Sequence, residues 1–249
     1  MNQQKTAIAL FKALALSLLA FSAQAAQFVT NGSFETTTNG VGQLGYNTNA
    51  TGWSVPAPSG SYTFLFTAGS ADTTGVTGQW GNLQLWGPGN GSNNGLPSTS
   101  PSGGNYIASD GDFQRGAVSQ NITGLIAGDQ YTLKFWWAGI QQKNFDGPTT
   151  EGWNVSLGSN TQSTGVVSLA SHGFSGWNQE TFTYTATSSS EVLSFLAYGT
   201  PGGQPPFSLL DGVSLTGPTT ATPLPAALFF VVPALAGVFG FSRRKQNKA

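Results

Sequence analysis

The stretch Gln130-Tyr-Thr-Leu-Lys-Phe-Trp-Trp-Ala138 decides the fold class, because its apolar and polar residues alternate. One face carries Tyr131, Leu133, Phe135 and Trp137, and the other carries Thr132, Lys134 and Trp136. A period of two is typical of a β-strand with one face in a core. The stretch therefore predicts a half-buried strand with Trp137 packed inside and Trp136 on the more polar face.

Similar short alternations, bounded by turn residues, recur along the chain, and no segment has the pattern of a long amphipathic helix. They cover residues 61–67, 82–86, 105–109, 116–122, 152–157, 164–169, 181–186, 191–198 and 212–215. Residues 87–104 are low in complexity and are predicted to be a mobile surface loop. The pattern predicts an all-β fold, a single antiparallel β-sandwich over residues 26–217.

Six motifs follow one another along this body. They are Phe28-Val-Thr-Asn-Gly-Ser-Phe-Glu35, Thr51-Gly-Trp53, Ser119-Gln-Asn-Ile122, Ala127-Gly-Asp-Gln-Tyr-Thr-Leu-Lys-Phe135, Gly176-Trp177 with Thr181-Phe-Thr-Tyr184, and Leu210-Asp-Gly-Val-Ser-Leu215. The series resembles the galactose-binding-domain-like β-sandwiches of bacterial carbohydrate-binding modules and plant cell-wall proteins. The resemblance implies a jelly-roll sandwich but no particular function, because this fold hosts many roles.

Asp211 and Glu35 are the candidate metal ligands. The parity of the last strand puts Asp211 on the same face as Val213 and Leu215, where an unpaired carboxylate is costly. The resemblance implies a structural Ca²⁺ held by an acid near the N-terminus and an Asp near the C-terminus, the positions of Glu35 and Asp211, and Ca²⁺ prefers such oxygen ligands. The alternative is that Asp211 caps local backbone amides.

The tryptophans suggest a sugar-binding surface, since sugars present apolar C–H faces to aromatic rings. We assign Trp53, Trp137 and Trp153 to packing. The candidate ligand-binding residues are Trp136, on the polar strand face, and Trp80 and Trp86, which flank an alternating segment just before the Gly-rich loop. If the second face of the sheet is covered, Trp136 belongs to the core instead.

The N-terminus has the pattern of an export signal. Lys5 and Lys12 precede or border the apolar run 13–21, and Ala23-Gln-Ala25 fits the small-residue cleavage pattern. Residues 1–25 are therefore predicted to be a signal peptide.

The C-terminus combines a proline pair, an apolar run and a basic end. A linker, residues 218–222, leads to a segment at residues 223–246 that opens with Pro223, Leu224 and Pro225 and includes Arg243 and Arg244. Its apolar centre, residues 224–241, is long enough for a hydrophobic helix that crosses a bilayer. The segment resembles the PEP-CTERM sorting domain of Gram-negative bacteria, with Leu in place of the usual Glu.

The sorting-domain resemblance implies a membrane-embedded exosortase as a partner, transient anchoring in the inner membrane, and a final place at the cell surface or in an exopolysaccharide matrix. A plain transmembrane anchor that is never cleaved is the alternative. The basic flank of the segment agrees with export of the body, because cytoplasmic ends are enriched in Lys and Arg.

Charge and composition exclude several functions. The body contains three basic residues and all ten acidic residues, a net charge of −7, which argues against a nucleic-acid partner. The chain has no cysteine, so thiol chemistry is excluded. Its one histidine, His172, is predicted to lie in a loop. Asp110-Gly-Asp112 looks like a turn rather than a metal site.

The leading hypothesis is therefore an exported, non-catalytic surface or matrix protein that binds exopolysaccharide. The alternatives are a structural or adhesive matrix protein without glycan affinity, and a weakly marked glycosidase. The latter needs two facing carboxylates, and Asp110, Asp112, Asp146 and Glu151 are the candidates.

Overall fold

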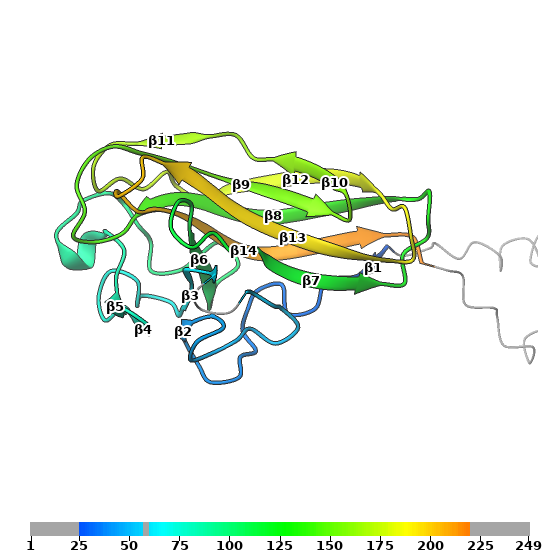
Figure 1. The fold of residues 1–249 in the computed structure, drawn as a ribbon, viewed down its shortest axis with the longest axis horizontal. Coiled ribbons are helices and arrows are strands. Elements are labelled where there is room, and N and C mark those ends of the chain that lie inside the picture. The colour runs from blue at the N-terminus through cyan, green and yellow to red at the C-terminus, as the bar shows by residue number, and fades with distance from the viewer. Residues whose placement is uncertain (1–24, 57–59, 220–249) are drawn as a thin grey trace, which may run out of the picture. The chain divides into compact units, whose positions relative to one another are not determined.

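A computed structural model of the chain describes residues 25–56 and 60–219 and has an all-β fold (Figure 1). The larger sheet has the order β12 (Asn178–Thr185), β8 (Gln130–Gln141), β14 (Pro206–Gly217), β6 (Tyr106–Asp110), β3 (Thr63–Phe66) and β2 (Gly42–Gln43), with β1 (Ala26–Gln27) beside β14. The smaller sheet has the order β10 (Asn160–Ser163), β9 (Thr149–Leu157), β13 (Ser190–Thr200) and β7 (Val118–Thr123), with β11 (Val167–Leu169) beside β9. The predicted antiparallel β-sandwich is confirmed.

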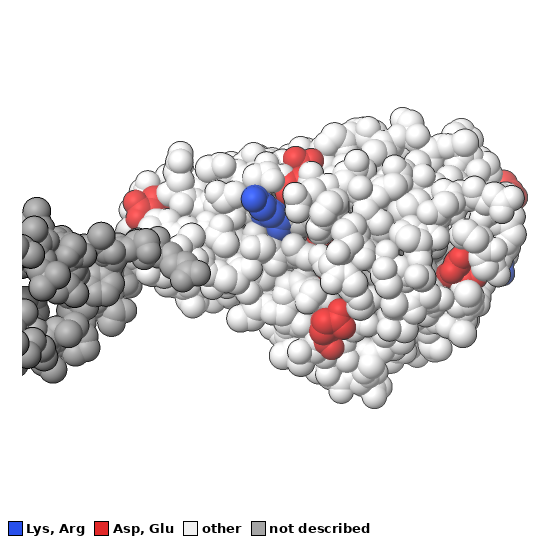
Figure 2. Space-filling view, turned by 180° about the vertical axis from the view of Figure 1, so that it is seen from behind, with Lys and Arg blue, Asp and Glu red and all other residues white. Residues whose placement is uncertain are grey.

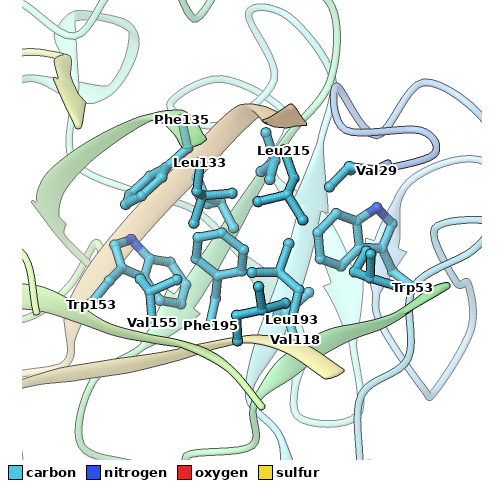
Figure 3. Close-up of a cluster of buried hydrophobic side chains, with 14 of the residues drawn as sticks. Val29, Trp53, Val118, Leu133, Phe135, Trp153, Val155, Leu193, Phe195 and Leu215 are labelled. Carbon is cyan, nitrogen blue, oxygen red and sulfur yellow. The ribbon is translucent and has the colours of Figure 1, made fainter. Parts of the chain in front are cut away.

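The main core lies between the two sheets. Figure 3 shows Leu133, Phe135 and Leu215 from the larger sheet facing Trp153 and Phe195 from the smaller one. The Trp153 ring also donates a hydrogen bond from Nε1 to the Leu209 carbonyl at 3.0 Å, which ties the two sheets together. Burial of these large side chains supplies the main favourable free energy of folding.

The predicted alternation along β8 is confirmed. Tyr131, Leu133 and Phe135 are fully buried, Trp137 is 3% exposed, and Trp136 on the opposite face is half-buried. Trp53 and Trp153 are buried as well, as the sequence predicts. After Trp137 the residues of β8 no longer alternate between buried and exposed, because both faces of the larger sheet are covered there.

A second apolar cluster accounts for that cover. Segment 67–104 includes the hairpin of β4 (Val76–Gly78) and β5 (Gly81–Leu83) and the 3₁₀ turn η2 (Pro88–Asn90), and it packs on the outer face of the larger sheet (Figure 1). The cluster includes Phe64, Phe66, Leu83, Leu85, Leu96, Ala138, Ile140, Phe207 and Leu209. Residues 87–104 are therefore not a free loop: Leu96 is 8% exposed and Ser100 is 4% exposed.

The two sheets also meet along one side. The Gln162 side chain on β10 donates from Nε2 to the Thr183 carbonyl on β12 at 2.9 Å. This bond joins edge strands of different sheets.

The ends of the chain lie outside the described residues. The predicted signal peptide, residues 1–25, lies outside the described residues except for Ala25. The predicted sorting segment, residues 223–246, lies wholly outside them. Across 25–56 and 60–219, no helix has the length and apolar character needed to cross a bilayer.

Candidate functional site

A pocket of about 360 Å³ lies where β6 and β8 end. It is lined by Tyr62, Trp80, Asp110, Asp112, Phe113, Gln142, Phe145, Gly203 and Pro205. Four aromatic rings and three hydrogen-bonding side chains thus converge from separate segments of the chain. Its volume is in the range of small-ligand sites, and such sites combine apolar walls with a few polar groups.

The β4–β5 hairpin presents Trp80 to this pocket. Gln79 and Trp80 form its two-residue tip, and Trp80 is 69% exposed. Two contacts hold the tip: the Gln79 N–H donates to Gln43 Oε1 at 2.8 Å, and the Gln79 amide donates to Gln114 Oε1 at 2.8 Å. A large apolar ring is therefore held in the open on an anchored hairpin.

Asp110 supplies the buried polar group. Its Oδ1 accepts hydrogen bonds from the N–H groups of Asp112 at 2.8 Å and Phe113 at 3.0 Å, so the predicted turn is confirmed. Its Oδ2 is buried and has no hydrogen-bond partner among the described residues. Burial raises the pKa of the Asp110 carboxyl to about 6, although the two backbone donors oppose the shift. The wall of the pocket thus contains a buried carboxyl oxygen without a hydrogen-bond partner among the described residues.

Aromatic packing supports the wall next to Asp110. Phe113 is 47% exposed and its ring meets the edge of Tyr62, with centroids 5.4 Å apart. Tyr62 in turn packs against Phe64 at 4.6 Å, so the wall continues into the second apolar cluster. Burial, together with the charge of Asp110, raises the pKa of the Tyr62 hydroxyl to about 12, so it is neutral and can donate a hydrogen bond.

Trp86 does not line the pocket, but it is bonded to a residue that does. Its ring is half-buried and donates from Nε1 to the carbonyl of Phe145, a lining residue, at 3.0 Å. The ring of His172 stacks on the ring of Trp86, with centroids 3.9 Å apart. The sequence places His172 in a loop, as observed, but no motif or spacing indicates this stack.

Trp136 occupies a different surface. It lies on β8 opposite Asp211 of β14 and Gln179 of β12, on the outer face of the larger sheet. Six residues separate it from Gln142 in the pocket, which corresponds to about 20 Å along an extended chain. The structure therefore brings Trp80 and Trp86 to one region and leaves Trp136 apart from them.

The orientation predicted for Asp211 is wrong. A bulge in β14 between Asp211 and Ser214, with Gly212 at φ +60°, turns Leu210, Val213 and Leu215 toward the main core. Asp211 points to the opposite face, where it is fully buried. Strand parity failed here because one extra residue in a bulge reverses the alternation.

The Asp211 carboxylate is nevertheless held beside Glu35. Its Oδ2 accepts a hydrogen bond from the Ser100 hydroxyl, and Oδ1 accepts the N–H of Gly212 at 2.6 Å. Burial raises the pKa of Asp211 to about 7, the two donors oppose the shift, and the charge of Glu35 adds to it. Glu35 Oε1 accepts the Asn105 N–H at 2.8 Å. Glu35 itself is exposed, so the pair combines one buried and one exposed carboxylate, and oxygen ligands of this kind are suited to a shared Ca²⁺.

The structure gives little support to a catalytic carboxylate pair. Asp110 and Asp112 belong to one turn, and Asp146 is paired with His172 at 2.6 Å. Glu151 is fully buried, with its side chain against Gly139 of the facing sheet. Across the described residues, no group of three or more His, Cys, Asp and Glu side chains is placed to hold a metal ion. A site built from Glu35 and Asp211 would therefore need backbone or hydroxyl oxygens as well.

No protein family and no curated protein in the comparisons matches the chain. Among solved structures, it is similar to TmCBM61, solved in complex with β-1,4-galactotriose, with 15% identity and a TM-score of 0.42 over 76% of this chain and 97% of that one. The K1 cleaved adhesin domain of Lys-gingipain from Porphyromonas gingivalis W83 has 12% identity and a TM-score of 0.42 over 80% and 99%.

The CBM22-1 xylan-binding domain of Xyn10C from Paenibacillus barcinonensis has 11% identity and a TM-score of 0.36, over 81% of this chain and 99% of that one. Because all three TM-scores are below 0.5, these likenesses are no basis for a function, which has to come from the pocket itself.

Proposed function

We propose that this chain is an exported, non-catalytic protein that binds exopolysaccharide, and that the pocket beside Trp80 is its saccharide site. The observation that carries the proposal is the pairing of two exposed rings, Trp80 and Phe113, with the unpartnered buried oxygen of Asp110. The C–H faces of a sugar can pack on such rings while its hydroxyls bond to a carboxyl and to the Gln142 amide.

The sparse charge of the surface supports a neutral ligand. Figure 2 shows a face on which charged side chains are few and scattered. Without a basic patch, acidic polymers would gain little from electrostatic attraction. Neutral polysaccharide is therefore the expected partner.

The termini support the proposed destination. A signal peptide over residues 1–25 would send the body across the inner membrane, and the Pro223-Leu224-Pro225 segment with Arg243 and Arg244 would anchor it until an exosortase acts. The protein would then remain at the cell surface or in the matrix of a Gram-negative bacterium. We also assign the body to the galactose-binding-domain-like jelly rolls, on the six motifs that it carries.

The test is affinity electrophoresis of the purified chain in gels that contain galactan, xylan or laminarin. We expect at least one polysaccharide to retard the wild-type chain, and Trp80→Ala or Asp110→Asn to abolish the retardation. Trp136→Ala is the matched control, because its ring lies on the other surface.

Other outcomes of the electrophoresis would support a different binding surface or one of the alternative functions. Retardation that is lost only in Trp136→Ala would move the site to the sheet face. No retardation of the wild-type chain would favour a structural or adhesive matrix protein without glycan affinity. Release of reducing ends from any of the three polysaccharides would favour a glycosidase.

We further propose that Glu35 and Asp211 hold a structural Ca²⁺, supported by the effect of the Glu35 charge, which raises the pKa of the buried Asp211 carboxyl. Removal of the ion would leave the negative charges of both carboxylates uncompensated, so a chelator should lower the melting temperature of the wild-type chain. Asp211→Asn should abolish that difference. Equal melting curves of the wild-type chain with and without chelator would contradict the calcium site.

A further inference from the structure

His172 connects β8 and segment 87–104 through its backbone hydrogen bonds. Its N–H donates to Gln141 Oε1 at 2.9 Å. Its carbonyl accepts hydrogen bonds from Ser92 Oγ at 3.0 Å and from Asn94 Nδ2 at 2.9 Å. Gln141 is fully buried at the end of β8, so the backbone of His172 is fixed to the core and to segment 87–104.

The backbone of His172 is also in an uncommon conformation. Its φ of +64° lies in the left-handed region, which costs free energy for a residue with a side chain. The hydrogen bonds at both of its peptide groups hold it there. This conformation is maintained by the surroundings, which marks the position as one that the fold specifies closely.

The imidazole ring joins two further groups. It stacks on Trp86 with centroids 3.9 Å apart and an interplanar angle of 30°, and its Nε2 lies 2.6 Å from Asp146 Oδ1. Trp86 Nε1 then donates to the carbonyl of Phe145 at 3.0 Å, and Phe145 lines the pocket. Both ends of the Phe145–Asp146 peptide segment are thus connected to His172.

We propose that His172 is a positioning residue of the saccharide pocket: through Trp86 and Asp146 it fixes the wall formed by Phe145. This inference rests on the proposed function of that pocket. His172 does not line the pocket, so it acts only through the two groups that it holds.

The arrangement predicts that the imidazole ring supports the wall through two contacts. The ring stacks on Trp86, and its Nε2 shares a hydrogen bond with Asp146 Oδ1. A residue without the ring would lose both contacts, while its backbone could keep the hydrogen bonds to Gln141, Ser92 and Asn94.

The first measurement follows the pocket wall without any ligand. In isotope-labelled chain, the ring resonances of Phe145 and the indole N–H resonance of Trp86 are recorded for the wild-type chain and for His172→Asn. The variant tolerates a positive φ but has no ring, so we expect it to displace both resonances.

The second measurement compares the retardation of variants in galactan, xylan and laminarin gels. We expect His172→Asn to weaken binding by about two- to five-fold relative to the wild-type chain, because it removes the stacked ring that supports Trp86. Asp129→Asn, at the opposite end of β8, is the matched control and should behave as wild type.

Two results would overturn the inference. Phe145 and Trp86 resonances that are the same in His172→Asn and wild type would show that His172 does not position the wall. Displaced resonances with unchanged retardation of His172→Asn would show that the position of the wall does not affect binding. If no polysaccharide retards the wild-type chain, the proposed function fails, and the resonances still decide whether His172 positions Phe145.

Discussion

Glu151 is a single residue with an unusual environment. Its carboxyl group is fully buried between the sheets, and neither oxygen has a hydrogen-bond partner of good geometry among the described residues. Burial raises its pKa to about 8, and the Thr149 hydroxyl opposes the shift only in part. The folded chain therefore keeps this group protonated where an unfolded chain would release the proton.

The sign of the resulting pH effect follows from that difference. Glu151 contributes most to stability below its ordinary pKa of 4.5, and this contribution is lost as the pH rises toward 8. Chemical denaturation should show that the free energy of unfolding falls by up to about 1.4 kcal/mol per pH unit from this group. Glu151→Gln should remove that part of the slope.

Two other carboxyls change stability with pH in the same direction, since burial raises the pKa of Asp110 to about 6 and the pKa of Asp211 to about 7. The difference between wild type and Glu151→Gln isolates Glu151, and it is clearest between pH 7 and pH 8. Parallel stability curves for the two chains over that interval would contradict the prediction.

Trp136 and Trp137 are neighbours in the sequence with opposite environments. Trp137 is 3% exposed in the main core, so Trp137→Ala should destabilise the fold by about 3–5 kcal/mol. Trp136→Ala should cost much less, because its ring is only half-buried. Urea denaturation of both variants measures the difference; similar losses would mean that the outer face at Trp136 is as tightly packed as the core.

These two residues also show what the sequence can predict. An unbroken alternation from Tyr131 to Trp137 is enough to assign each side chain to a face. For Asp211 the same reasoning fails, because whether a strand contains a bulge depends on its neighbours in the sheet. The stack of His172 on Trp86 cannot be predicted from the sequence for a similar reason, because it joins loops that are far apart in the sequence.

At the level of elements, β14 and segment 67–104 show the largest differences from expectation. A strand was predicted at residues 212–215, whereas β14 covers Pro206–Gly217. Segment 87–104 has no apolar periodicity, yet it packs through single residues such as Leu96 and through the Asn94 amide. Such contacts leave no regular pattern in a sequence, so the cover over the larger sheet could not be anticipated.

The bulge in β14 gives a prediction at this scale. Gly212 has φ +60°, and a Cβ there would collide with the Ser102 hydroxyl and lie 3.0 Å from Trp136 Cδ1. Gly212→Ala should therefore destabilise the chain by more than the roughly 1 kcal/mol expected from a positive φ alone. Thermal denaturation measures the loss.

Gly128→Ala is the control for Gly212→Ala. Gly128 also has a positive φ, +92°, but an added Cβ would meet nothing within 4 Å. If the two variants lose equal stability, close packing of the bulge against Ser102 contributes nothing.

At the scale of the whole molecule, the sequence of the two ends leads to a prediction about processing. The signal-peptide pattern and the Pro223-Leu224-Pro225 segment predict a mature protein without either terminus. Intact-mass spectrometry of the exported protein should give a mass that lacks residues 1–25 and the basic end with Arg243 and Arg244. Recovery of a chain that retains both arginines would leave only a permanent membrane anchor.

The hydrogen bond between Gln162 on β10 and the Thr183 carbonyl on β12 affects how readily two molecules could associate through their sheet edges. A β-sandwich has open edges, and an unpaired carbonyl on an edge strand is a place where a strand of another molecule can add. Here one such carbonyl on β12 is already occupied by a side chain from the neighbouring sheet. A strand that added to β12 at Thr183 would have to displace the Gln162 side chain, so this bond opposes edge-to-edge association at that position, and its effect matters most where the local concentration of the chain is high.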